Sequence, residues 1–261
     1  MRNRLRIRQS FILTQISQIE PNSINMQPPC VLPKDVINVI KSVGVIPVFY
    51  HPEVNTILQA IRTAYRCGAR VFEFLHQRDN RGLRIFSWLV DETADMPDLI
   101  LGVGTVLDAT MTDRYIQAGA KFISSPFLRK DMAEVCHRAN ILWMSGCSTQ
   151  TDIREARELG ASMVMIIPGN VLGPDFLRRA VLEYTDLHFI PSGGVDLTEP
   201  SLRSWIHSGA LAVRLGDQLF PRETVVAQEW DKIERNVRNA LEQVKKLKSP
   251  GKKGSFPSII L

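Results

Sequence analysis

Short apolar runs recur through the middle of this chain at intervals of about 20 to 27 residues. Each run is rich in β-branched and aromatic residues and ends in a glycine, proline or polar turn, which is typical of a buried β-strand. The predicted strands lie at 44–50, 70–75, 98–104, 121–125, 141–146, 163–167, 187–194 and 211–216.

The segments between these runs have the spacing of amphipathic helices. Residues 53–69 are typical, with Ile57, Ile61 and Ala64 on one face and Gly68 as the stop. Strands that alternate with helices pair in parallel through right-handed crossovers. Eight such units in roughly 200 residues predict a closed (β/α)8 TIM barrel, with an open doubly wound sheet as the alternative.

Two further helices frame the barrel, and three segments divide the chain. A helix at 33–43 would close the barrel floor, and a last helix would span about 222 to 247. We expect a mobile N-terminal extension at 1–30, a single barrel domain at 31–247 and a basic tail at 248–261.

Composition and charge exclude several classes of protein. The net charge of +5 comes from arginines near the start and lysines near the end, and the middle is almost balanced, so we expect no nucleic-acid partner. No run of about 20 apolar residues occurs, so no membrane span is expected. Four scattered cysteines without a C-x-x-C pair fit a reducing compartment, and we predict a cytoplasmic protein.

Glu73 is the sharpest chemical signal in the sequence. It interrupts the apolar run "RVFEFL", in which Phe72 and Phe74 would face the helices, so the strand's period of two turns Glu73 into the barrel. A carboxylate there must be hydrogen-bonded, paired with a cation or shifted in pKa toward a useful base. Both a proton-transfer group and a satisfied structural acid remain open.

The loops after the last two predicted strands are candidates for an anion site. Barrels bind phosphate at this place, where glycines such as Gly193 and Gly194 expose backbone N–H groups. Asp217 follows the eighth strand, and its carboxylate would repel a phosphate in a poorly solvated pocket.

Six motifs in register resemble one enzyme family. The motifs "GVIPVFYH", "VFEF", "GVGTV", "FISSP", "IIPGNVLGP" and "PSGGV" are similar to those of the 2-keto-3-deoxy-6-phosphogluconate (KDPG) and 4-hydroxy-2-oxoglutarate aldolases over about residues 34–220. The resemblance implies a class I aldolase barrel without a metal or other cofactor, a homotrimer and a small keto-acid or sugar-acid substrate. In that family a lysine on the sixth strand forms a Schiff base with pyruvate, and a glutamate on the second strand shuttles protons.

Part of the family's site is retained in this chain. Glu73 matches the proton-shuttling glutamate, Thr105 the threonine beside pyruvate, and Pro126 the proline after the fourth strand. Gly193 and Gly194 match the glycines on the phosphate side.

Three positions depart from the family's pattern. The Schiff-base lysine falls on Met165, and the serine on the phosphate side falls on Asp217. The arginine for the substrate carboxylate falls on Gln77, with Arg78 adjacent as a substitute if the loop rotates. A thioether cannot condense with a ketone, so Schiff-base chemistry at Met165 is lost.

Two functional interpretations follow. The first is a pseudo-aldolase, or a barrel of altered activity, that binds a small keto or sugar acid. The alternative is an active aldehyde-lyase that uses a relocated lysine or a metal held by Glu73, His76 and His51. Cys147 is a further candidate nucleophile, against the simpler interpretation of a packed thiol.

Overall fold

The computed structural model of the protein describes residues 31–77 and 81–249. Its strands are β1 (Val45–Phe49), β2 (Val71–Leu75), β3 (Ile100–Gly104), β4 (Phe122–Ser125), β5 (Leu142–Cys147), β6 (Met163–Ile166), β7 (His188–Pro191) and β8 (Val213–Leu215). Its helices are α2 (Pro33–Val43), α3 (Val54–Arg66), α4 (Gly82–Glu92), α5 (Ala109–Gln117), α6 (Lys130–Arg138), α7 (Gln150–Glu158), α8 (Gly169–Glu183), α9 (Glu199–His207), α10 (Arg222–Val226) and α11 (Trp230–Lys248).

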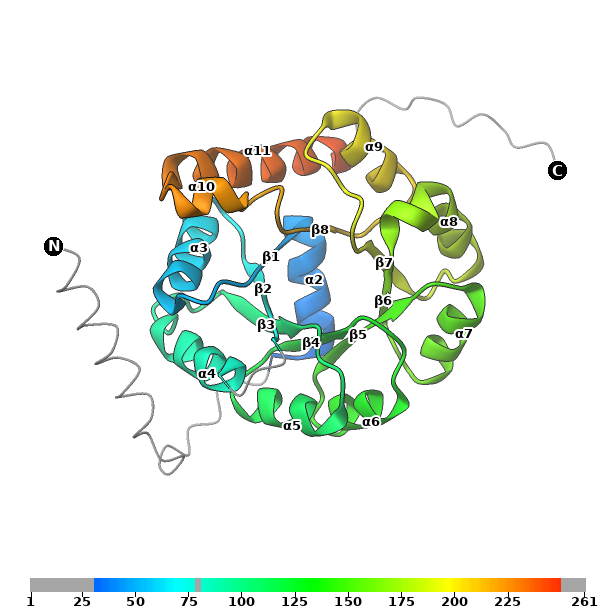
Figure 1. Ribbon diagram of the computed structural model, residues 1–261. Helices are drawn as coiled ribbons and strands as arrows, with labels where there is room; N and C mark the ends of the chain where they lie inside the picture. The colour runs from blue at the N-terminus through cyan, green and yellow to red at the C-terminus, as the bar shows by residue number, and fades with distance from the viewer. Residues whose placement is uncertain (1–30, 78–80, 250–261) are drawn as a thin grey trace, which may run out of the picture. The chain divides into compact units, whose positions relative to one another are not determined.

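The strands form an eight-stranded parallel sheet that curls into a barrel inside a ring of helices (Figure 1). The order is β7-β6-β5-β4-β3-β2-β1-β8, and the Leu211 amide donates to the Phe189 carbonyl at 2.8 Å where the two edges meet. The predicted (β/α)8 barrel is confirmed, and the open sheet is wrong.

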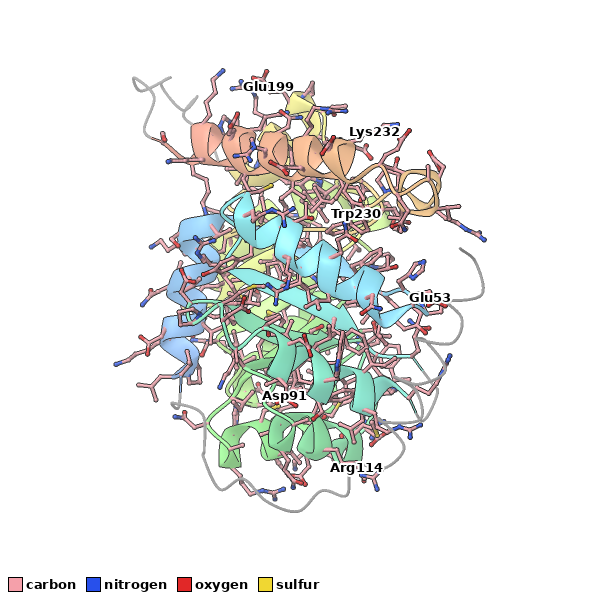
Figure 2. All side chains as sticks on the ribbon, turned by 90° about the vertical axis from the view of Figure 1, so that its left-hand side faces the viewer. Glu53, Asp91, Arg114, Glu199, Trp230 and Lys232 are labelled. Atoms are coloured by element: carbon pink, nitrogen blue, oxygen red, sulfur yellow. The ribbon has the colours of Figure 1, made fainter. Side chains whose placement is uncertain are left out.

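Alternation along the strands separates two apolar cores. Phe72 and Phe74 pack in the layer between the strands and the surrounding helices, whereas Val71 lies in the barrel interior. Charged side chains such as Asp91 and Arg114 lie on the outer side of the helices (Figure 2). The period of two in "RVFEFL" therefore faces Glu73 inward, as predicted.

Helix α2 closes the floor of the barrel. Its buried residues Val36, Ile37 and Ile40 pack against the interior strand residues, and α2 is visible through the middle of the ring in Figure 1. At the end of α11, the Lys248 ammonium donates to the carbonyls of Lys41 and Leu211, both at 2.6 Å. Burial and the nearby Lys41 charge lower the pKa of Lys248.

Three predicted boundaries differ in the structure. The expected single helix at 222–247 is two helices, α10 and α11, because the chain turns at Gln228, whose φ is 59°. The strand predicted at 187–194 ends at Pro191, because positive-φ glycines follow it. Lys248 belongs to α11 rather than to the tail, and the predicted segments at 1–30 and 250–261 lie outside the described residues.

Within 31–77 and 81–249, no helix is both long enough and apolar enough to cross a membrane.

Candidate active site

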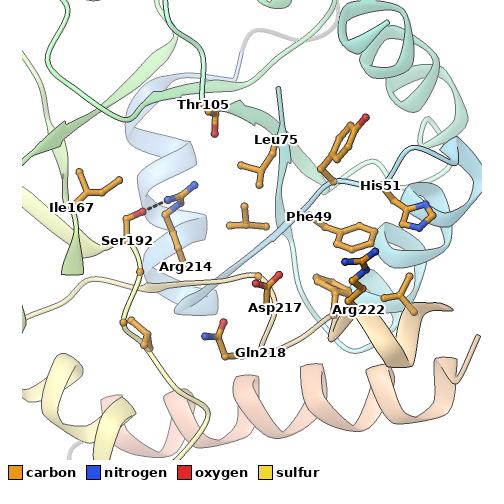
Figure 3. Close-up of a pocket in the computed structure, with 18 of the residues that line it drawn as sticks. Phe49, His51, Leu75, Thr105, Ile167, Ser192, Arg214, Asp217, Gln218 and Arg222 are labelled. Carbon is orange, nitrogen blue, oxygen red and sulfur yellow. Dashed lines mark hydrogen bonds between the residues drawn. The ribbon is translucent and has the colours of Figure 1, made fainter. Parts of the chain in front are cut away.

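A cavity of about 820 Å³ opens at the carboxyl ends of the strands (Figure 3). Its lining comes mainly from the ends of β1, β7 and β8, with single residues from the ends of β2, β3 and β6. The cavity therefore lies toward one side of the barrel mouth.

Glu73 is completely buried on β2 and forms an ion pair with Arg214 of β8. The guanidinium makes two hydrogen bonds to the carboxylate: Nε donates to Oε2 at 2.9 Å, and Nη2 donates to Oε1. The Ser124 hydroxyl also donates to Oε1, at 2.8 Å. Such a two-point pair fixes the geometry of both side chains and satisfies the buried charge.

Gly104 provides the space that this carboxylate needs. A Cβ atom at residue 104 would lie 1.7 Å from Glu73 Oε1 and 2.9 Å from the Ser124 oxygen. Because atoms cannot approach so closely, any larger residue at Gly104 would displace Glu73 from its partners. The second glycine of "GVGTV", Gly104, is thus explained by its packing against Glu73.

Arg214 belongs to the candidate site, although no sequence motif marked it. It lines the cavity with 11% of its side chain exposed, and its Nη1 donates to the Ser192 hydroxyl. The signal was present: Arg214 interrupts the apolar run "LAVRLG" as Glu73 interrupts "RVFEFL". Two opposite charges on inward positions of two strands would have predicted a lumenal pair.

Met165 occupies the same layer of the barrel interior as this pair. Barrel interiors stack in layers of four side chains from alternate strands, and hydrogen bonds place Glu73, Ser124 and Arg214 of β2, β4 and β8 in one layer. On β6, Met163 and Met165 lie in the apolar cluster of the interior, and Met165 is the one nearer the mouth. Met165 therefore fills the fourth position, and the layer's cation comes from β8.

Only some of the predicted site residues reach the cavity. Thr105, Gly193, Gly194 and Asp217 line it, and Thr105 has a positive φ of 61°, which is uncommon for a non-glycine residue. Among the described residues, Asp217 has no ion-pair partner.

The other predicted residues lie elsewhere. Met165 is 1% exposed and does not line the cavity, because it packs in the interior below it. Gln77 and Pro126 are also absent from the lining, because the cavity lies toward β7, β8 and β1. Arg78 lies outside the described residues.

The three proposed metal ligands do not converge. Glu73 is bound to Arg214, the His76 Nδ1 atom pairs with the Tyr115 hydroxyl at 2.8 Å, and the His51 Nδ1 atom accepts from the Glu53 amide at 3.1 Å. In the described part of the chain, no group of three or more His, Cys, Asp or Glu side chains could hold a metal ion. The alternative of a metal held by Glu73, His76 and His51 is therefore not supported by the described residues.

Other candidate nucleophiles are also remote or inert. Within the described ranges, the cavity lining contains no lysine: Lys121 precedes β4 at the opposite end of the barrel, and Lys130 begins α6. Cys147 is buried in the outer apolar core, and burial raises the pKa of its thiol to about 12. The thiol therefore stays protonated near neutral pH, in agreement with a packed cysteine.

Known proteins are similar to this chain in sequence and in fold. The family model described as KDPG and KHG aldolase matches residues 36–236. The 2-dehydro-3-deoxy-phosphogluconate aldolase of Haemophilus influenzae is 24% identical over 215 residues, which cover 81% of this chain and 98% of that protein. The Treponema pallidum aldolase of the same name is 25% identical over 199 residues, which cover 76% and 92%.

A solved structure agrees with the sequence relatives. The KDPG aldolase of Legionella pneumophila, captured with pyruvate as a covalent carbinolamine, has a TM-score of 0.70 and 20% identity, covering 80% of this chain and 98% of that one. The barrel and its cavity at the strand ends thus define an aldolase-type (β/α)8 protein. The chain belongs to the KDPG and KHG aldolase family.

Proposed function

We propose that this protein is a pseudo-aldolase: a barrel that binds a small keto or sugar acid at its mouth without forming a Schiff base. The observation that carries the proposal is Met165, a buried thioether where the family resemblance expects the reactive lysine. The covalent carbinolamine in the Legionella relative requires an amine that attacks the pyruvate carbonyl. A thioether has no N–H to lose and cannot form that bond.

The state of Glu73 supports the same proposal. Its carboxylate is held by Arg214 and Ser124 inside the barrel, and Glu73 itself does not line the cavity. A general base must come within hydrogen-bond reach of the proton that it removes. Glu73 in this arrangement acts as the structural partner of Arg214.

Borohydride trapping tests the proposal directly. Borohydride reduces an enzyme–pyruvate iminium to a stable amine, so intact-mass measurement after treatment with pyruvate should show no stoichiometric adduct. A relative of known activity serves as the positive control. An adduct mapped to any single lysine of this chain would overturn the proposal and assign aldolase chemistry to that residue.

We further infer a homotrimer from the family resemblance. Sedimentation velocity at micromolar concentration should give the mass of three chains, and a stable monomer would contradict this inference.

A further inference from the structure

Arg214 has hydrogen-bond donors left over at the inner end of the cavity. A guanidinium has five N–H donors, and three of those of Arg214 are directed to Glu73 and Ser192. Two N–H groups have no partner among the residues that the structure describes, and this side chain lines the cavity. Figure 3 shows the guanidinium between Ser192 and the open cavity. This end of the cavity is built to donate to an acceptor on a ligand.

The charges around the cavity favour a monoanion over a dianion at this end. Arg214 and Arg222 contribute two positive charges to the cavity. Asp217 in the lining and Glu73, which is paired with Arg214, contribute two negative charges, so the sum is zero. A monoanion in contact with Arg214 is attracted more than it is repelled by the more distant Glu73, because Coulomb energy falls with distance. A dianion such as a phosphate would leave twice the uncompensated charge in a poorly solvated site.

The outer end of the cavity combines apolar side chains with His51 and Arg222. The rings of Phe49 and Phe220 pack at 4.8 Å between centroids, and His51 stacks on Phe49 at 6.2 Å. Val226 lines the same end with 70% of its surface exposed. Figure 3 shows Phe49, His51 and Arg222 on the side of the cavity away from Arg214. Phe49 and Phe220 are 8% and 2% exposed, so Val226 offers the largest apolar surface of the three for a ligand to cover.

The volume of the cavity is larger than a three-carbon acid needs. At about 820 Å³ it lies in the range of pockets that bury drug-sized ligands, about 300 to 1,000 Å³. Pyruvate on Arg214 would leave the outer end in contact with water.

From these features we infer that the cavity binds a monocarboxylic acid with an apolar tail. The carboxylate accepts from the free N–H groups of Arg214, and the tail covers Val226 beside the largely buried rings of Phe49 and Phe220. The inference rests on the proposed function and names its ligand class: an unphosphorylated acid with a hydrocarbon tail. Glu73 is then a positioning residue that fixes the direction of the guanidinium.

Three 2-oxo acids with the same head group and charge test the tail. Isothermal titration calorimetry with the full-length protein measures the affinities of pyruvate, 4-methyl-2-oxopentanoate and phenylpyruvate. Gluconate serves as the comparison acid, because its tail is polar. Because the three additional carbons of 4-methyl-2-oxopentanoate bury further apolar surface, we expect it to bind at least about tenfold more tightly than pyruvate.

Two matched valines test the location of the tail. Val226→Asn should weaken the two tailed acids about threefold or more and leave pyruvate unchanged. Val171→Asn is the control, because Val171 is 74% exposed on α8 and does not line this cavity. It should leave every affinity unchanged.

Variants of the ion pair test the carboxylate anchor. The charge-matched double variant Glu73→Gln/Arg214→Met should weaken all three oxo acids about tenfold or more. Arg214→Lys keeps the positive charge but loses the paired N–H donors of the guanidinium, and it should weaken binding of the three oxo acids severalfold. This variant still tests the anchor if the double variant does not fold.

Equal affinities across the series, binding of gluconate alone, or an equal effect of both valine variants would overturn the inference. None of these results concerns the missing Schiff base. A borohydride-trapped adduct would instead overturn the proposed function, so the two failures are distinguishable.

Discussion

Replacing Arg214 by methionine should destabilise the barrel far more than breaking an exposed ion pair. The change removes two hydrogen bonds to Glu73, whose side chain is 0% exposed, and leaves its carboxylate with only the Ser124 hydroxyl. Water cannot replace the lost partner at a fully buried position. Breaking a buried pair in this way typically costs about 3 to 5 kcal/mol, and we expect Arg214→Met to fall in that range.

A double-mutant cycle separates the pair from its surroundings. Glu73→Gln should cost less, about 1 to 3 kcal/mol, because Arg214 reaches the cavity and keeps its Ser192 contact. The double variant should cost less than the sum of the single variants by about 2 kcal/mol or more, because neither buried partner is then left charged and unpaired.

Urea unfolding followed by circular dichroism measures all four proteins. Arg157→Met is the control, because its ion pair with Asp186 has the same chemistry at 2.7 Å, but both side chains are 53% exposed. That variant should leave the free energy of unfolding nearly unchanged. If Arg214→Met is no more destabilising than this control, or if the two single changes simply add, the ion pair does not have the structural role described above.

Three further predictions address chemistry at and below the cavity. Met165→Lys should gain only weak borohydride trapping with pyruvate, because Arg214 already occupies Glu73; a stoichiometric adduct, or no adduct at all, would contradict this. Native protein should bind an unphosphorylated sugar acid more tightly than its phosphate ester, and Asp217→Ser should narrow the difference, whereas equal calorimetric affinities in the native protein would remove the argument. Iodoacetamide at pH 8 should spare Cys147 in the native fold and label it in urea, because burial raises its thiol pKa to about 12; rapid native labelling in peptide maps would refute this.

These predictions have a common physical basis, which is the strand that supplies the cation beside Glu73. In the family resemblance, the sixth strand supplies the cation near Glu73; in this chain the eighth strand supplies it. The guanidinium, unlike a lysine amine, cannot lose its proton to become a nucleophile. The layer thus keeps its charge balance while losing the group that would form an iminium.

Sequence by itself determined the architecture. Eight apolar runs with helices between them allow few other folds, because parallel strands need crossovers and every apolar face must be buried. It also determined that Glu73 points into the barrel, since Phe72 and Phe74 require the opposite face. The absence of an amine at Met165 was equally readable, because side-chain chemistry does not depend on the fold.

Only the tertiary structure decided which groups meet. Glu73 and Arg214 are 141 residues apart in the chain, and their contact depends on the shared layer of β2 and β8. The tertiary structure also keeps Met165 below the cavity, and among the described residues it does not bring His51 and His76 together with Glu73 in a group that could hold a metal ion. Periodicity assigns a side chain to a face of its own strand, but the partner across a closed barrel is fixed by strand order and tilt, which local pattern does not encode.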